Sequence, residues 1–279
     1  MSVIAHERVD AFRVRGLHDA TIMRATYKKQ RFAAHSHDTY VVGLITAGAL
    51  RFRCGRQLLT APVGTLCIIN PGEVQTGEAV SVEGWSYWTA YLPAKSFQPL
   101  LEEMPTARDL PFFSTRVTDD ITARTAAENF FRAVTATSLP LAQSELSISF
   151  LTLLLERFHK NPSVSNCGVG EVPLIAVAKE YMAAHFSRSI GLAEVAAVAG
   201  VTSFHLTRLF KANTGLAMHA WLVQYRIERA REMLLRGVPP ASVAADCGFS
   251  DQAHMARWLR RITGMTAKDV QSMSRTLNQ

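Results

Sequence analysis

Apolar residues recur with the period of a helix in two similar stretches of the C-terminal part of the chain. In the first stretch they stand at i, i+3, i+4 and i+7, which predicts a short helix with one apolar stripe, made by Leu192, Val195, Ala196 and Ala199. Gly200 is placed to end this helix, and Thr202 to cap the next one. The next helix has its own apolar stripe, made by Leu206, Leu209 and Phe210. The pattern predicts a helix, a turn and a second helix.

The same order of residues returns further along the chain. When Arg208 is aligned with Arg257, His205 falls on His254 and Gly215 on Gly264. The second copy has Gly248 as its helix stop and Ser250 or Asp251 as its cap, with inward positions at Val243, Ala244, Cys247, Met255, Trp258, Leu259 and Ile262. Helix pairs with Ala/Gly turns also occur in purely structural bundles, but two matched copies favour a pair of helix-turn-helix units.

A long helix is predicted between the two copies, over Ala217–Arg236, because an apolar face runs through it without Pro or Gly. Its length of about 30 Å is close to the roughly 34 Å of one DNA turn. Such a helix would place the second helix of each unit in adjacent major grooves on one side of a duplex.

The chain has 279 residues and a net charge of +7, and the charge is distributed unevenly. From Pro173 onward there are 13 Lys/Arg and 7 Asp/Glu, a net charge of +6, against 17 and 16 before that point. A basic face alone would suit solvent, a membrane surface or a polyanion. The repeated helix pairs select double-stranded DNA as the partner, with affinity that falls as salt rises.

Residues 173–279 resemble the DNA-binding domain of the AraC/XylS family of transcription regulators. The resemblance rests on LAEVAAVAGVTSFHLTRLFKANTG (192–215), RIERAREMLLRG (226–237) and CGFSDQAHMARWLRRITGMT (247–266), while Ala267 stands where the family usually has a proline. It implies base-reading roles for Phe204, His205, Thr207, Arg208, Gln252, Ala253, His254 and Arg257. The remaining predicted DNA contacts are Ser203, Lys211, Asp251 and Arg260.

Residues 20–92 contain short runs of β-branched and aromatic residues that are separated by Gly and Pro turns, which predicts a small β-barrel or jelly roll. HSHDTYVVGLITAGALRFRCG followed by APVGTLCIINPGEVQTGEA resembles the cupin-type sensing domain that precedes AraC-type DNA-binding domains. We therefore expect a small-molecule effector to bind in this part of the chain.

His35 and His37 point to the same side of a strand, as a metal site requires. Metal-binding cupins add a glutamate and a third histidine, whereas this chain has Val41 and Val42 in the first region and Gln75 in the second. We predict no metal, no cofactor and no catalytic residues. The predicted effector-binding residues are His35, His37, Tyr40, Glu73, Gln75, Trp85 and Tyr87. Alternatively, Trp85, Tyr87, Thr89 and Tyr91, which share one strand face, simply form core.

Three helices are predicted after the strands, over 94–103, 119–137 and 141–159. The last has more than one apolar face, so it is either buried twice within its own domain or packed against a second copy. In regulators similar to this chain the region often forms the dimer contact. Residues 161–172 are rich in Gly, Ser and Asn and predict a linker.

The predicted fold is α+β: a sensing domain over 1–160 (cupin-like barrel about 20–92, helices about 94–160), a linker over 161–172 and an all-α domain over 173–279. No secretory signal or membrane span is evident, and the four cysteines are expected to be reduced thiols in a cytoplasmic protein. We expect a ligand-responsive transcription regulator, an activator by family habit, that acts as a homodimer and has RNA polymerase as a further partner. The alternatives are a constitutive DNA-binding regulator and a cupin enzyme fused to a DNA-binding domain.

Overall fold

The computed structural model describes residues 7–14, 17–102, 110–135, 140–159 and 173–275. The predicted linker, 161–172, lies outside these residues. The chain forms two compact units: the first comprises Met1–Gln30, Ser36–Glu73 and Gly77–Ser163, and the second comprises Arg31–His35, Val74–Thr76 and Val164–Gln279.

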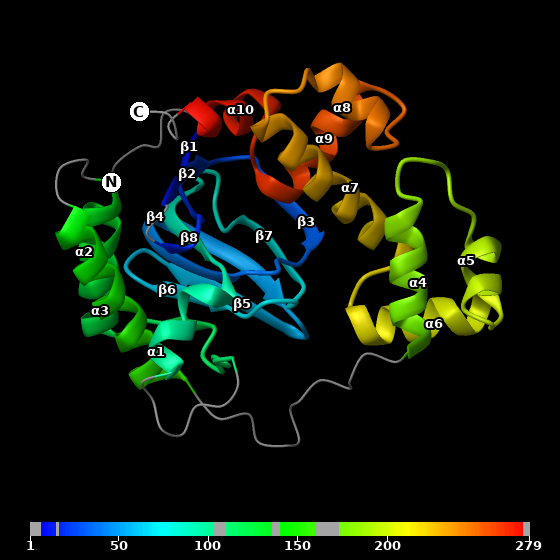
Figure 1. Ribbon diagram of the computed structural model, residues 1–279. Coiled ribbons are helices and arrows are strands. Elements are labelled where there is room, and N and C mark those ends of the chain that lie inside the picture. Colours follow the sequence, from blue (N-terminus) through cyan, green and yellow to red (C-terminus); the bar gives the residue numbers. More distant parts are fainter. Residues whose placement is uncertain (1–6, 15–16, 103–109, 136–139, 160–172, 276–279) are drawn as a thin grey trace. The chain divides into compact units, whose positions relative to one another are not determined.

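The strands form one mainly antiparallel sheet (Figure 1). They are β1 (Arg8–Val14), β2 (Ala20–Tyr27), β3 (Arg31–His35), β4 (Tyr40–Cys54), β5 (Gln57–Pro62), β6 (Leu66–Ile69), β7 (Gln75–Ala79), β8 (Trp85–Leu92) and β9 (Val117–Thr118). The main order is β1-β2-β8-β4-β6-β9; β5 and β7 pair with β4, and β3 pairs with β7.

The predicted order of a strand domain, helices and an all-α domain is confirmed. Among the described residues the sheet is not closed into a barrel, because β1 and β9 end the strand order without pairing with each other. β9 contributes only two residues, and both pair with β6. Strand runs were visible in the sequence, but closure depends on which distant strands hydrogen-bond, and no local pattern carries that information.

Helices cover one face of the sheet in the first unit, as Figure 1 shows. They follow a turn of 3-10 helix at Ala94–Ser96 and comprise α1 (Gln98–Glu102), α2 (Ile121–Thr135) and α3 (Pro140–Phe158). Leu44, Ile68 and Ala90 of the sheet share a core with Phe130 of α2 and Phe150 of α3. Burial of this apolar surface is the main stabilising contribution of the layer.

The predicted dimer helix is α3, and much of its apolar surface is buried within its own unit. Its buried apolar side chains include Phe150, Leu151, Leu154, Leu155 and Phe158, whereas Ile148 is 54% exposed. The first alternative, burial within the domain, accounts for most of its apolar positions. A dimer contact through this helix stays a prediction.

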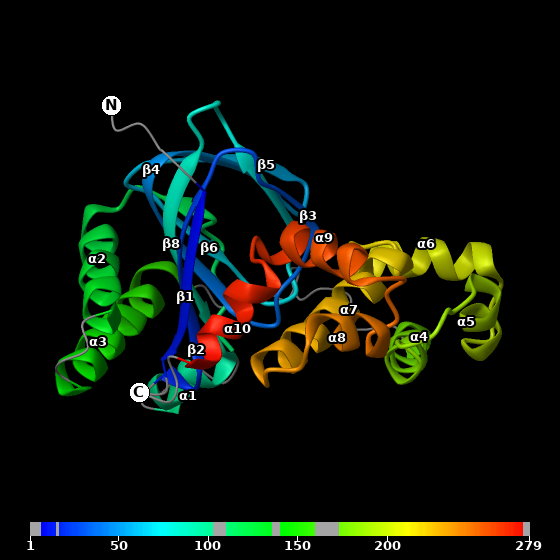
Figure 2. The ribbon, with the colours of Figure 1, turned by 90° about the horizontal axis from the view of Figure 1, so that it is seen from above.

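The second unit contains the helices that were predicted for the C-terminal part of the chain. They are α4 (Pro173–Ala184), α5 (Leu192–Val198), α6 (Ser203–Thr214), α7 (Met218–Leu235), α8 (Pro240–Asp246), α9 (Gln252–Thr263) and α10 (Ala267–Arg275). Thus α5–α6 and α8–α9 are two helix-turn-helix units joined by the long helix α7 (Figure 2). Phe210 of α6 contacts Trp221 near the start of α7. The Cys247 thiol, which follows α8, donates to the sulfur of Met233 near the end of α7.

Candidate DNA-binding and ligand-binding sites

The two candidate recognition helices, α6 and α9, begin and end in the same way. Thr202 Oγ1 accepts the His205 backbone N–H at 3.3 Å, and Asp251 Oδ1 accepts the His254 N–H at 2.6 Å. Each helix has twelve residues and ends at a glycine with φ of 73°, Gly215 or Gly264. The caps satisfy amide groups that the first helical turn leaves without partners.

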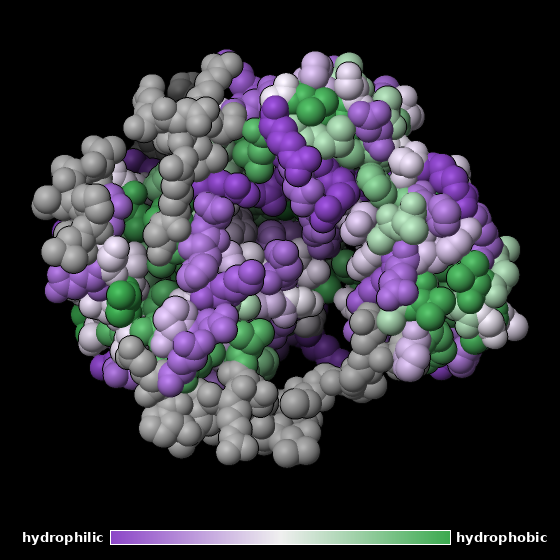
Figure 3. All heavy atoms as spheres, in the orientation of Figure 1, coloured by the Kyte–Doolittle hydropathy of each residue, from purple (hydrophilic) through white to green (hydrophobic). Residues whose placement is uncertain are grey.

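Most of the predicted DNA-contacting side chains are exposed on α6 and α9. The exposed residues are Phe204, His205, Thr207, Arg208, Lys211, Asp251, Gln252, Ala253 and Arg257; Ser203, His254 and Arg260 are half-buried. Figure 3 shows apolar side chains among polar ones over α5 and α6, where Phe204 is 73% exposed. The Arg208 guanidinium lies 5.8 Å from the Phe204 ring centre, so a cation and an apolar ring occupy one patch.

Two of the predicted DNA-contacting residues, His254 and Asp251, are engaged by other groups of the chain. The Trp258 indole N–H donates to His254 Nε2 at 3.0 Å, and His254 Nδ1 lies 3.0 Å from Ser250 Oγ. Because Nε2 accepts, the proton of a neutral His254 is on Nδ1 and points to Ser250. Asp251 also acts as a helix cap, and the bonds from the His254 amide and the Ser250 hydroxyl lower its pKa.

Four predicted inward positions are less buried than expected: Leu192 is exposed, and Ala199, Leu209 and Trp258 are half-buried. Trp258 is half-buried, since its indole N–H reaches outward to His254 on the preceding turn. Leu192 is 45% exposed because it lies in the first turn of α5, and the buried stripe of that helix is Val195 and Ala196. The spacing of i to i+4 between His254 and Trp258 was the available signal for their contact.

A segment that the sequence did not single out, residues 186–188, joins the two helix-turn-helix units. Arg226 of α7 donates from Nε to the Phe186 carbonyl at 2.7 Å and from Nη2 to the Arg188 carbonyl at 2.8 Å. Gly248, in the turn of the second unit, has φ of 73°, and a methyl group there would come within 2.7 Å of the Ser187 carbonyl oxygen. The segment between α4 and α5 therefore contacts both α7 and the second turn.

Glu194 connects α4 to α5 through a charged cluster. Its carboxylate pairs with Arg188, accepts the Tyr181 hydroxyl and accepts the Gly191 backbone N–H at 3.3 Å. The Arg188 hydrogen bond and then the Tyr181 hydroxyl lower the pKa of Glu194 from its ordinary 4.5 to about 2.

We expect this cluster to stabilise the fold above pH 4.5 and to lose its effect as pH falls from 4.5 towards about 2, because the folded state holds the carboxylate ionised. Thermal unfolding of the full chain and of Glu194→Gln, followed by circular dichroism at several pH values, measures the contribution of the cluster to stability. The difference in melting temperature should shrink across that range. Glu180→Gln, which changes an exposed carboxylate on α4, is the control. A difference that is the same at pH 6 and pH 2.5 would contradict the prediction.

The predicted effector-binding residues are divided between the two sides of the sheet. Tyr40 lies in the core beneath the helices, where its hydroxyl donates to the Pro111 carbonyl at 2.7 Å and its ring contacts Phe97 and Phe113. Trp85 and Tyr87 lie on the other face, stacked with ring centres 6.3 Å apart. The structure thus does not bring Tyr40 together with those two rings. Trp85 and Tyr87 are 0% and 8% exposed, and their part in effector binding stays a prediction.

The remaining predicted residues lie around β3 and β7. His35 is buried, with Nδ1 2.7 Å from the Ala33 carbonyl oxygen, and burial lowers its pKa. His37 contacts the Tyr91 ring edge-on, and Gln75 is half-buried in β7.

Glu73 is held within the first unit. It pairs with Arg116 and accepts the Asn70 backbone N–H at 2.9 Å. The contact with Arg116 crosses a long sequence separation, so no spacing in the sequence could indicate it. Among the described residues, no three His, Cys, Asp or Glu side chains are grouped so as to hold a metal ion.

Two family models match the chain. Residues 18–154 match the AraC-like ligand binding domain, and residues 195–273 match a helix-turn-helix domain. The chain is 24% identical over 252 residues to the uncharacterized HTH-type transcriptional regulator YbfI of Bacillus subtilis, covering 90% of this chain and 86% of that protein. It is 40% identical over 68 residues to the bifunctional transcriptional activator/DNA repair enzyme Ada of Escherichia coli, covering 24% of this chain and 19% of Ada.

Among solved structures, the unsaturated fatty acid bound ToxT of Vibrio cholerae has a similar fold. The TM-score is 0.56 at 11% identity, covering 98% of this chain and 97% of that one. In the part of the chain that the structure describes, no helix is long and apolar enough to cross a membrane. The two matched domains and their order, with the paired helix-turn-helix units on α7, show that the chain belongs to the AraC family of transcriptional regulators.

Proposed function

We propose that this transcriptional regulator is sequence-specific and ligand-responsive, and that a small molecule bound in the N-terminal domain changes its activity on DNA. The order of the two domains supports this proposal. A ligand shifts the balance between two states only by its difference in affinity for them, so the bound and free forms must present different surfaces to DNA or to a second subunit. The proposal includes activation of transcription with RNA polymerase as a partner, a homodimer, and a location in the cytoplasm with the DNA.

The observation that carries the DNA-binding part is the match between α6 and α9. Arg208 and Arg257 occupy equivalent exposed positions on helices that are capped alike and joined by α7. A guanidinium binds the O6 and N7 atoms of guanine through two hydrogen bonds, and exposed polar groups beside it suit phosphates. We infer that each helix enters one of two adjacent major grooves.

In vitro selection of bound duplexes by the full chain tests this inference. The expected product is a site with two conserved halves about one helical turn apart. The affinity for that site should fall linearly with salt on a log–log scale, by about 0.9 for each phosphate that the protein neutralises. A single conserved half, or a collection without a common sequence, would contradict the proposal that both units read bases.

The effector-dependent part needs a separate test, because ToxT is described with a bound unsaturated fatty acid but is only 11% identical to this chain. Screening small molecules by thermal shift detects a ligand, since binding to the folded state raises the melting temperature. A ligand of the N-terminal domain should then change affinity for the selected duplex or transcription from it. Tight binding that leaves both unchanged would favour the constitutive regulator.

A further inference from the structure

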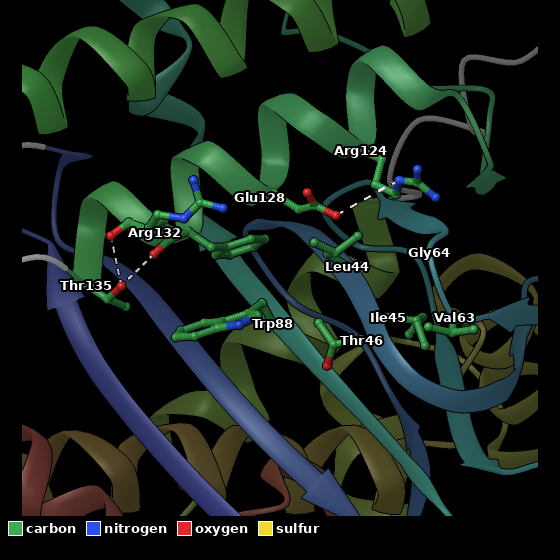
Figure 4. A pocket seen from close by; sticks show the side chains of 11 residues that line it. Leu44, Ile45, Thr46, Val63, Gly64, Trp88, Arg124, Glu128, Arg132 and Thr135 are labelled. Atoms are coloured by element: carbon green, nitrogen blue, oxygen red, sulfur yellow. Dashed lines mark hydrogen bonds and ion pairs between the residues drawn. The ribbon is translucent and has the colours of Figure 1, made fainter. Parts of the chain in front are cut away.

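A pocket of about 510 Å³ lies between α2 and the helix-covered face of the sheet in the first unit (Figure 4). The sheet contributes residues of β4 and β8, and the turn after β5 closes one side with Val63 and Gly64. Its volume falls in the range of small-molecule sites, roughly 300–1,000 Å³. The predicted effector residues Trp85 and Tyr87 belong to the opposite face of β8, so this is a different site.

One part of the pocket is an apolar wall with a flat aromatic surface. Trp88 of β8 pairs across the sheet with Leu44 of β4, and both side chains line the pocket. Trp88 stacks against Phe131 of α2, with ring centres 5.6 Å apart and planes 23° apart. A flat apolar group could lie against this wall and lose contact with water.

The other part is a polar stripe on α2. Arg124, Glu128 and Arg132 follow one another at i+4 spacing, so they share one face of the helix, and Figure 4 shows all three above the sheet residues. Arg124 Nε lies 4.0 Å from Glu128 Oε1, at the end of the pocket where its guanidinium covers Gly64. The charges at that end largely offset each other.

The end of the pocket near Trp88 is positive. Arg132 is exposed, and its guanidinium donates to the neutral amide oxygen of Asn129 at 3.4 Å. Arg24 of β2 lies over the Trp88 ring, 5.4 Å from its centre. Asp10 stands across the sheet from Arg24 but pairs with Arg8 at 2.8 Å.

We propose that this pocket binds an organic anion with a flat apolar body, its carboxylate on Arg132 and its ring against Trp88. The planar guanidinium matches a carboxylate through two parallel hydrogen bonds, and the apolar wall covers the rest of the molecule. Such a ligand would connect α2 to the sheet. The inference does not depend on the proposed effector response or on DNA binding.

Isothermal titration calorimetry of the full chain with 2-naphthoate tests the site. We expect 2-naphthamide, which has the same ring without the charge, to bind at least about ten-fold more weakly. Arg132→Gln should weaken 2-naphthoate binding by about ten-fold or more. Arg51→Gln, which removes an exposed arginine of β4 that pairs with Glu78, should leave binding unchanged.

Circular dichroism establishes that each variant is folded before titration. Equal affinity of the folded Arg132→Gln variant and the unaltered chain would overturn the proposal, as would the absence of 2-naphthoate binding at millimolar concentration. Tyr87→Phe reports on the opposite face of the sheet. If Tyr87→Phe weakens binding and Arg132→Gln does not, the probe binds on that face and the assigned pocket is wrong.

Discussion

The substitution Gly248→Ala is expected to lower the free energy of unfolding by about 2–5 kcal/mol. Two effects add at this position. The backbone φ of 73° is unfavourable for a residue with a Cβ, and the new methyl group would lie 2.7 Å from the Ser187 carbonyl oxygen and 2.9 Å from the Phe186 carbonyl oxygen. Both obstacles are backbone atoms, which cannot move aside without shifting the segment that Arg226 holds.

Gly200 provides the matched control, because it occupies the equivalent turn of the first unit. Its φ is 69°, but a methyl group there would meet no atom within 4 Å. Gly200→Ala should therefore cost only the backbone term, about 1–2 kcal/mol. Urea unfolding of the full chain, followed by circular dichroism, compares the two. Equal losses of stability would mean that the segment 186–188 yields readily to the added methyl group.

Arg208→Ala and Arg257→Ala are each expected to weaken binding to the selected duplex by about 1–3 kcal/mol if the guanidinium contacts a base. The two side chains are exposed on separate helices, so each change should relax sequence preference in one half of the site and leave the other half intact. Titration of duplexes with single changes in either half, at fixed salt, measures both effects.

Lys268→Ala serves as the control for loss of positive charge, since Lys268 is exposed on α10, outside both recognition helices. It should leave sequence preference unchanged. Uniform weakening of all duplexes by Arg208→Ala or Arg257→Ala, with a smaller salt dependence, would assign that arginine to a phosphate. In that case one helix-turn-helix unit would bind the DNA phosphates without recognising the base sequence.

The helices of the second unit could be predicted because their signals are local. Periodic apolar residues, Thr202 and Asp251 as caps, and Gly215 and Gly264 as stops all act within a few residues of the helix that they define. The long helix was expected over Ala217–Arg236 and spans Met218–Leu235. The exposure of the recognition faces followed from the same periodicity.

The N-terminal domain was predicted less well because its decisive contacts join residues far apart in the chain. The pairing of β3 with β7, and the isolation of β1 from β9, have no sequence pattern of their own. Glu73 was expected to face a ligand, but Arg116 and Asn70 engage its carboxylate. The pocket under α2 was missed because Trp88 and Arg132 come together only when the helix packs on the sheet.

The contacts of residues 186–188 with Arg226 and with the turn at Gly248 also bear on the spacing between two half-sites that the protein can bind. One added base pair between two half-sites moves the second by about 3.4 Å and turns it by about a tenth of a revolution around the duplex axis. A protein whose two recognition helices were joined by a flexible hinge could follow that displacement. Here residues 186–188 contact both α7 and the turn at Gly248. If α6 and α9 each read one half-site, as we propose, these contacts fix the distance between the half-sites that the protein can bind.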